Sequence, residues 1–225
     1  SGAIIFDGGS SSEDQVGRYR ILPYMKYLGY QKIQIAVISH MDIDHYSGIK
    51  ELLEMGKIKY LGLPEIPKDE TMKKIIGIAK KRGTTIFYLS RGRQITTKDG
   101  SLKVLHPQKN SQMEKNAASL VMQGKILGYR VLLTGDVEKE GEEELLSEEL
   151  ERADILKAAH HGSKNSTSNE FLQKVQPKQT VISCGKQNRY GHPHLETIHR
   201  LQTYRTKIYR TDRSGAIIFF KRRDG

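Results

Sequence analysis

Imidazole and carboxylate side chains are concentrated directly after one short apolar segment, residues 35–38. Two histidines and two aspartates stand there within six residues: His40, Asp42, Asp44 and His45. Imidazoles and carboxylates are the usual protein ligands of zinc and manganese ions. A polar connection from a strand to a helix capped by an aspartate would also place an acid here, but it would not need the histidines. The spacing therefore favours a metal site.

The order of residues within this segment predicts how its side chains point. An apolar segment rich in β-branched residues is typical of a buried strand, and a turn should follow it. In that turn we expect His40, Asp42 and Asp44 to converge, and Met41 and Ile43 to point back to the core.

Polar residues also follow other apolar segments, at Asp7, Asp136, His160, His161 and His192. Ligands of α/β proteins bind beyond the carboxyl ends of the strands, so we expect these residues to meet the first group. Two divalent ions about 3.5–4 Å apart are held by shared ligands. Asp136 suits the bridging position because it follows an apolar strand and a glycine. Asp136 could instead cap a helix, and Asp7 could occupy a turn, so the residues alone leave both alternatives open.

The pattern of apolar and turn residues predicts an α/β protein. We expect strands at 3–6, 35–38, 57–63 and 84–89, hairpins over 95–106 and 119–134, and strands at 155–159, 180–183, 207–211 and 216–221. We expect helices at 21–28, 47–55, 69–82, 139–150, 169–175 and 194–202. No repeat or low-complexity linker divides the chain, so residues 1–225 are expected to form a single domain. This order favours two central β-sheets flanked by helices, an αββα sandwich.

The composition limits the class of protein. The formal net charge of +11 favours a polyanionic partner such as nucleic acid, although a basic surface can also serve solubility. The charge is polarised, because acidic residues gather in 138–151 and basic residues in 73–93 and 205–223. The single cysteine, Cys184, excludes an intrachain disulfide and a thiolate zinc cluster. No apolar run reaches the ~18 residues that a membrane span needs.

The motifs resemble a known family. SHMDIDH, LLTGD and a later strand-end histidine are similar to the signature of the metallo-β-lactamase superfamily. More narrowly, FDGG, SHMDIDHYSGI, VLHP, NAASLV, LLTGD, ILKAAHHGS and NRYGHP, in this order, resemble the soluble domain of ComEC, the competence DNA-uptake channel. The resemblance implies a metallo-β-lactamase αββα sandwich. In the family a strand with a VGQGD-like motif precedes FDGG, and it is absent here, so we expect the sheet to lack its first strand.

The resemblance also implies a pair of divalent metal ions. It assigns His40 and Asp42 to the first ion, Asp44, His45 and His192 to the second, and Asp136 to the bridge between them. Asp42 stands where most of the superfamily has histidine, and Asn116 falls near the place of another histidine. More oxygen and less nitrogen shifts the preference toward harder ions, so we expect Mn2+ as well as Zn2+. No small-molecule organic cofactor is implied.

Two further histidines have alternative roles. His160 and His161 could each complete a metal shell, or protonate the leaving oxygen as a histidine does in the superfamily's nucleases. We favour His161 as the acid or as a phosphate contact. Together with Asp44 these histidines are the expected catalytic residues.

The remaining predictions concern residues around the ions. Asp7 and Asn116 are expected to support the ligands. Ser163, Arg189 and Tyr190 are expected to contact phosphate or base, and helix capping or loop support are the alternatives for them.

The expected activity is metal-dependent hydrolysis of phosphodiester bonds in DNA during competence uptake. A small-molecule hydrolase, such as a lactonase or a β-lactamase, is one alternative, but the sequence has no tryptophan and the charge of +11 would be unnecessary for it. A non-catalytic DNA-binding module with a degenerate metal site is the other. By resemblance, the chain is a soluble domain of a plasma-membrane protein on its extracytoplasmic face. Its expected partners are single- or double-stranded DNA and the membrane channel portion of the same protein.

Overall fold

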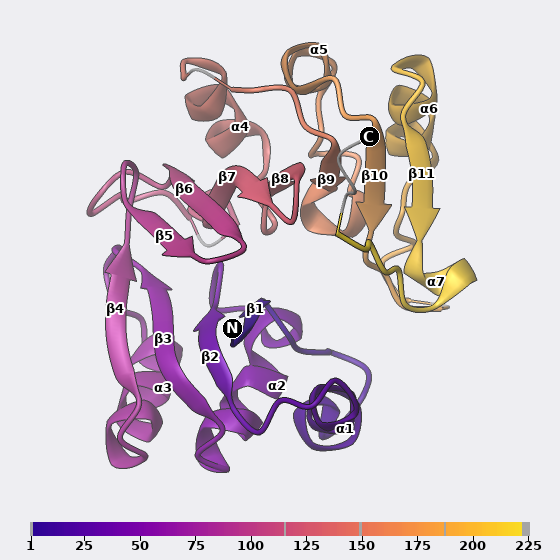
Figure 1. Cartoon of the computed structure of the whole chain (residues 1–225). Helices are drawn as coiled ribbons and strands as arrows, with labels where there is room; N and C mark the ends of the chain where they lie inside the picture. The colour runs from indigo at the N-terminus through magenta and orange to yellow at the C-terminus, as the bar shows by residue number, and fades with distance from the viewer. Residues whose placement is uncertain (1, 115, 149, 187, 222–225) are drawn as a thin grey trace. The chain divides into compact units, whose positions relative to one another are not determined.

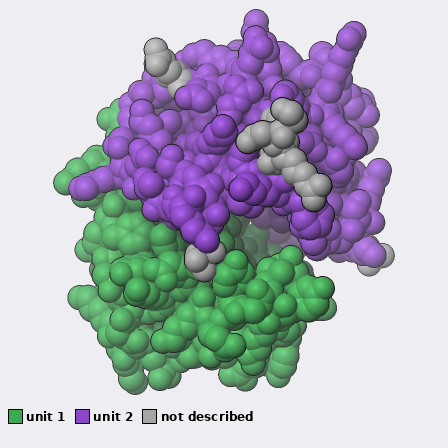
Figure 2. Space-filling view, viewed as in Figure 1, with its two compact units in different colours: residues 1–90, 108–115 green, residues 91–107, 116–225 purple. Residues whose placement is uncertain are grey.

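The computed structural model describes residues 2–114, 116–148, 150–186 and 188–221. The chain divides into two compact units, each built on its own β-sheet (Figures 1 and 2). Unit 1 comprises residues 1–90 and 108–115, and unit 2 comprises residues 91–107 and 116–225. The expectation of an α/β fold with two sheets and flanking helices is confirmed.

Unit 1 is a four-stranded parallel sheet in the order β1-β2-β3-β4. Because each strand lies beside the next one in the chain, right-handed connections place the helices on one face, where α2 packs against α3 and η1. Ile33, Leu52, Leu61 and Ile75 are fully buried between the strands and these helices. The elements are β1 (Ala3–Phe6), the π-helical turn η1 (Gly17–Ile21), α1 (Leu22–Tyr27), β2 (Ile33–Val37), α2 (Ile43–Glu54), β3 (Ile58–Pro64), α3 (Glu70–Lys81) and β4 (Thr85–Leu89).

Unit 2 is a seven-stranded mixed sheet in the order β11-β10-β9-β8-β7-β6-β5. The predicted hairpins form its antiparallel half, and β8 to β11 are parallel. Phe171, Leu172 and Leu201 join the helices to the sheet. The elements are β5 (Gln94–Thr97), β6 (Gly100–His106), β7 (Val121–Ile126), β8 (Tyr129–Leu133), α4 (Lys139–Leu146), β9 (Ile155–Lys157), the 3-10 turn η2 (Ala159–Gly162), α5 (Asn169–Val175), β10 (Gln179–Ile182), α6 (Leu195–Thr203), β11 (Lys207–Arg210) and α7 (Thr211–Ser214).

Two expectations from the sequence are wrong. Ile43 is 52% exposed, because α2 begins at Ile43 rather than four residues later, and its first turn faces outward. Residues 216–221 form no strand, because the short helix α7 follows β11 and the Thr211 hydroxyl accepts the Cys184 N–H at 2.9 Å. Arg222 and Arg223 of the basic range 205–223, and Glu149 of the acidic range 138–151, lie outside the described residues. Within the described ranges, no helix is long and apolar enough to cross a membrane.

Candidate metal centre

In unit 1, the parallel pairing of β1 and β2 places Asp7 beside the turn that carries Ser39 and His40. Phe6 pairs with Val37, and the next N–H, that of Asp7, donates to the Val37 carbonyl at 2.9 Å. Asp7 has a φ of +56°, a left-handed conformation that is uncommon outside glycine. The Asp7 carboxylate therefore lies at the carboxyl edge of the sheet, as the sequence predicts.

Asp7 orients both buried histidines of unit 1. Its Oδ2 accepts from His45 Nδ1 and from the Ser39 hydroxyl, each at 2.8 Å, and its Oδ1 accepts from the Ser39 N–H at 2.7 Å. Because the Ser39 hydroxyl gives its proton to Asp7, Ser39 Oγ is the acceptor for His40 Nδ1 at 3.0 Å. Both rings therefore carry their proton on Nδ1, which leaves a lone pair on each Nε2. A carboxylate fixing the tautomer in this way is the usual support of a metal-bound histidine.

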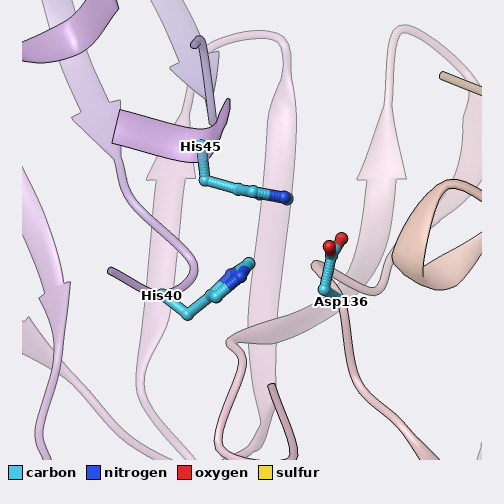
Figure 3. Close-up of side chains that lie close together, drawn as sticks. All are labelled: His40, His45 and Asp136. Carbon is cyan, nitrogen blue, oxygen red and sulfur yellow. The ribbon is translucent and has the colours of Figure 1, made fainter. Parts of the chain in front are cut away.

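These two rings are enclosed by the unit. His40 is 1% and His45 is 2% exposed, and their ring centroids lie 4.1 Å apart. His40 comes from the turn after β2, and His45 from the first turn of α2 (Figure 3). His40 Nε2 is buried and has no hydrogen-bond partner among the described residues. A bound cation would satisfy a buried lone pair that is otherwise costly to leave unmatched.

The two aspartates of the motif are more open than the histidines. Asp42 caps α2 by position, its side chain is 41% exposed, and its Oδ2 lies 3.7 Å from His40 Nε2. Asp44 is partly exposed in the first turn of α2. Oxygen ligands at the open edge of a histidine pair suit a hard divalent ion.

In unit 2, Asp136 lies at the centre of the second polar cluster. It follows β8, as drawn in Figure 3, and is 3% exposed. Lys157 Nζ donates to Asp136 Oδ1 at 3.3 Å and to the Gly135 carbonyl at 2.8 Å. The other oxygen, Oδ2, lies 3.3 Å from His161 Nε2 and 4.0 Å from His160 Nε2.

Hydrogen bonds fix the tautomers of this second pair as well. His161 Nδ1 donates to the Ser183 carbonyl, and His160 Nδ1 donates to Glu138 Oε1, each at 2.7 Å. The Nε2 lone pairs of both rings therefore face Asp136 Oδ2. Acceptors this close repel unless a proton or a cation lies between them. Asp136 Oδ2 and the two Nε2 atoms are therefore a group of ligand atoms that fits a divalent ion.

The backbone of these two histidines is strained. His160 has φ +45° and His161 has φ +53°. Consecutive left-handed residues cost roughly 1–2 kcal/mol each, and such strain is concentrated at functional sites. The loop is held by Arg200, which donates to the carbonyls of Thr167 and Ser166 at 3.0 and 2.9 Å.

His192 adds a further ring to unit 2. Its centroid lies 5.4 Å from that of His160 and 6.2 Å from that of His161, and Asn188 binds both its backbone N–H and its carbonyl. Burial, reinforced by the charges of the neighbouring histidines, lowers the pKa of His192 to about 4. His192 is therefore neutral near pH 7 and can offer a nitrogen lone pair.

Apart from Asp7, the residues expected around the ions lie within unit 2. Ser163 is buried, and its Oγ accepts the N–H of Asn165 at 3.3 Å, which supports the loop after His161. Tyr190 is exposed, stacks on His192 at 5.8 Å and lies under the Arg189 guanidinium at 4.8 Å. Asn116 is half-buried, and its carbonyl accepts the Ser119 N–H in a turn.

The sequence did not single out several residues that orient the site. Ser39 and Glu138 support histidines through Nδ1, and Lys157 fixes Asp136. The centroid of the His194 ring lies 4.8 Å from that of His192, and His194 Nδ1 accepts the Lys164 N–H at 3.1 Å. Position next to a motif was the available signal for Ser39 and Glu138. Nothing in the sequence identified Lys157, which belongs to a strand.

A model of the metallo-beta-lactamase superfamily matches residues 1–186. The chain is 38% identical over 216 residues to "ComE operon protein 3" of Bacillus subtilis (strain 168), covering 93% of this chain and 27% of that protein. It is 30% identical over 232 residues to "Competence protein ComA" of Neisseria gonorrhoeae, covering 99% of this chain and 30% of that protein. The chain therefore spans less than a third of the length of these curated relatives.

Solved structures share the fold at low sequence identity. The metallo-beta-lactamase fold protein YhfI from Bacillus subtilis has a TM-score of 0.57 at 14% identity, covering 92% of this chain and 82% of that one. CmlA, a diiron beta-hydroxylase from Streptomyces venezuelae, has a TM-score of 0.52 at 9% identity, covering 80% of this chain and 44% of that one. Because the family model covers most of the sequence and these structures share its fold, the chain belongs to the metallo-beta-lactamase superfamily.

Proposed function

We propose that the chain is a metal-dependent hydrolase that cleaves phosphodiester bonds in DNA. The observation that carries this proposal is the set of histidine tautomers: hydrogen bonds at Nδ1 leave Nε2 of His40 beside Asp42 in unit 1, and Nε2 of His160 and His161 beside Asp136 in unit 2. A net charge of +11 supports a polyanionic substrate. Relatives whose names refer to competence and recombination support DNA as that substrate.

We propose that the chain binds one pair of divalent ions, Mn2+ or Zn2+. The proposed ligands are His40, Asp42, Asp44, His45, Asp136 and His192. When bound, the ions supply positive charge that stabilises the phosphoryl oxygens as negative charge develops. The family model supports treating the units as halves of one catalytic domain, because its match includes residues of both. A single cooperative thermal transition is expected of such a domain.

The remaining side chains bind the strand and move protons in this proposal. His161 protonates the leaving oxygen in its protonated form, in which Nε2, the atom beside Asp136, carries the proton that is transferred and Nδ1–H stays on the Ser183 carbonyl. Tyr190 and Arg189, exposed beside His192, contact the substrate. Asp7 orients His45 directly and His40 through Ser39.

A cleavage assay tests the proposal. Labelled single- and double-stranded DNA is incubated with the protein after chelation and after addition of Mn2+ or Zn2+. We expect cleavage only with added metal, loss of cleavage in Asp44→Ala, and normal cleavage in Asp14→Ala, which removes an exposed carboxylate of the same unit. Full activity of the metal-free protein would contradict a metal-dependent reaction.

The same experiment separates the alternatives. DNA binding without cleavage by the wild type would favour a non-catalytic binding module. Hydrolysis of a lactone or a β-lactam without any DNA interaction would favour a small-molecule hydrolase. Metal analysis of the purified protein identifies the resident ion.

We further propose that the chain is the extracytoplasmic part of a longer membrane protein whose channel portion is its partner. The length of the relatives supports this, because the chain covers less than a third of each. Labelling of an exposed Lys98→Cys variant of the full-length protein by a membrane-impermeant maleimide in intact cells tests it. Protection of that cysteine until the cells are lysed would contradict the proposed location.

A further inference from the structure

Exposed aromatic residues are concentrated in one segment of unit 1, η1 and α1. Tyr19 is 63%, Tyr24 is 47% and Tyr27 is 83% exposed. The Tyr24 and Tyr27 rings stack on each other with centroids 6.4 Å apart and planes 21° apart. Exposed aromatic clusters of this kind mark interaction sites rather than ordinary surface.

The same segment carries only positive charge. No aspartate or glutamate occurs between Asp14 and Asp42, whereas Arg18, Arg20 and Lys26 do occur, and all three are exposed. Arg20, Tyr24 and Tyr27 follow one another at helical spacings of four and three residues, which places them along one side. We call Arg20, Tyr24 and Tyr27 the tyrosine face.

We propose that the tyrosine face binds single-stranded DNA, with unpaired bases stacking on Tyr24 and Tyr27 and phosphates contacting Arg20. Stacking on aromatic rings beside basic side chains is the general way in which proteins bind single strands. Every base has a flat face, so this binding does not require a particular sequence. An anionic lipid surface also attracts tyrosine and lysine, but it requires a larger aliphatic face. Leu28 is the single exposed large aliphatic residue of residues 17–28.

The tyrosine face is fixed to the helix that carries the motif. η1 packs against α2, and the Arg18 N–H donates to Glu51 Oε2 at 3.0 Å. Gly17 permits this approach, because a Cβ there would collide with the Gly48 carbonyl oxygen. Asp44 and His45 lie in the first turn of the same helix. Single-stranded DNA bound at the tyrosine face would therefore lie on a segment that packs against α2, the helix that carries the proposed ligands Asp44 and His45.

Binding measured without cleavage tests this surface independently of the proposed activity, although its role in substrate capture rests on that activity. Fluorescence anisotropy of a labelled oligothymidylate of about 15 nucleotides, a length suited to single-strand sites, is recorded in EDTA. We expect the double variant Tyr24→Ala/Tyr27→Ala to raise the Kd by roughly tenfold or more. The matched variant Tyr24→Phe/Tyr27→Phe keeps the rings and is expected to change the Kd less than about twofold.

Specificity for single strands is measured with duplex DNA of the same length, for which we expect the alanine pair to change the Kd less than about twofold. Lys80→Ala, an exposed cation on α3, controls for the loss of one basic charge in the same unit. An unchanged Kd for the single strand, an equal loss for the duplex, or a loss confined to phosphatidylglycerol vesicles would overturn the proposal. If the wild-type protein binds single-stranded DNA but does not cleave DNA when metal is added, the proposed binding surface is supported and the proposed nuclease activity is contradicted.

Discussion

The two units hold their histidines in different ways. In unit 1, His40 and His45 come from one continuous motif, are almost completely buried and depend on a single carboxylate, Asp7. In unit 2, the side chains of His160 and His161 are 24% and 20% exposed, and separate elements hold them through Glu138 and Ser183. The two rings of unit 1 are therefore enclosed and held by one carboxylate, whereas the two rings of unit 2 are partly open and held by separate elements.

The backbone conformation around the histidines also differs between the two units. His40 and His45 follow a regular strand and begin a regular helix, but His160 and His161 occupy consecutive left-handed conformations. Regular elements position ligands at little cost, whereas strain persists only where the surrounding structure enforces it. We therefore expect substitutions around the histidines of unit 1 to change mainly metal affinity, and substitutions around His160 and His161 to change proton transfer as well, and the following variants test it.

The largest expected effect is at Asp136. Asp136→Asn retains the shape of the side chain. It removes the negative charge that we propose bridges the two ions. We expect DNA hydrolysis to fall roughly a thousandfold, because a metal contributes several kcal/mol to such a reaction. Steady-state rates with Mn2+, together with calorimetric metal titration, measure the loss. Hydrolysis within about tenfold of the wild-type rate would show that Asp136 is not shared by the ions.

The next effect compares the two supporting carboxylates. Asp7→Asn disturbs two rings and is expected to reduce metal affinity or activity by about 10–100-fold. Asparagine tolerates the left-handed backbone of Asp7, so folding should be retained. Glu138→Gln disturbs one ring and is expected to reduce metal affinity or activity by about tenfold.

Metal titration and initial rates of both variants check this order. If Glu138→Gln reduces metal affinity more than Asp7→Asn, the ion is held mainly by unit 2 and the comparison must be reversed.

An acid of unit 2 away from the histidines is expected to control stability but not activity. Burial alone would raise the pKa of Asp154, but hydrogen bonds from Arg130 and Lys178 outweigh burial and lower it to about 2. A folded-state pKa below the ordinary 3.8 stabilises the fold above about pH 4, and this stabilisation is lost as pH falls toward about 2. The free energy of unfolding should decrease by about 2 kcal/mol over that range.

Denaturant melts at a series of pH values measure this decrease. Asp154→Asn should flatten it while leaving DNA hydrolysis at neutral pH unchanged. An unaltered pH profile in the variant would assign the acid sensitivity to another carboxylate.

The smallest expected effects come from two helix caps. Asp69 Oδ1 accepts the Met72 N–H at the start of α3, and Ser168 Oγ accepts the Phe171 N–H at the start of α5. Replacing either by alanine should cost about 1 kcal/mol of stability. Because α5 directly follows the loop of His160 and His161, only Ser168→Ala is also expected to lower kcat. Thermal melts and rates of both variants check this, and equal kcat values would mean that the loop does not depend on α5.

Much of the fold could be predicted from sequence, because hydrophobic period and turn residues act locally. β1 and α5 have the predicted bounds, and the paired hairpins of unit 2 form as expected. The failures have local causes too. Asp42 takes an extended conformation that starts α2 within the motif, so Ile43 turns outward, and α7 begins at Thr211, the last residue of the predicted strand 207–211.

The sequence by itself determined which residue types were available for metal chemistry and that they follow strands, because strands and their end residues are encoded in short segments. Only the tertiary structure decided which nitrogen of each histidine is available. Asp7 reaches Ser39 and His45 through the register of β1 against β2, and Ser183 reaches His161 because β9 and β10 pair in parallel. For His45, His160 and His161 the tautomer is set by a partner more than twenty residues away in the chain, and for His40 by Ser39, whose hydroxyl is oriented by Asp7, 32 residues earlier. No local pattern specifies these distant partners.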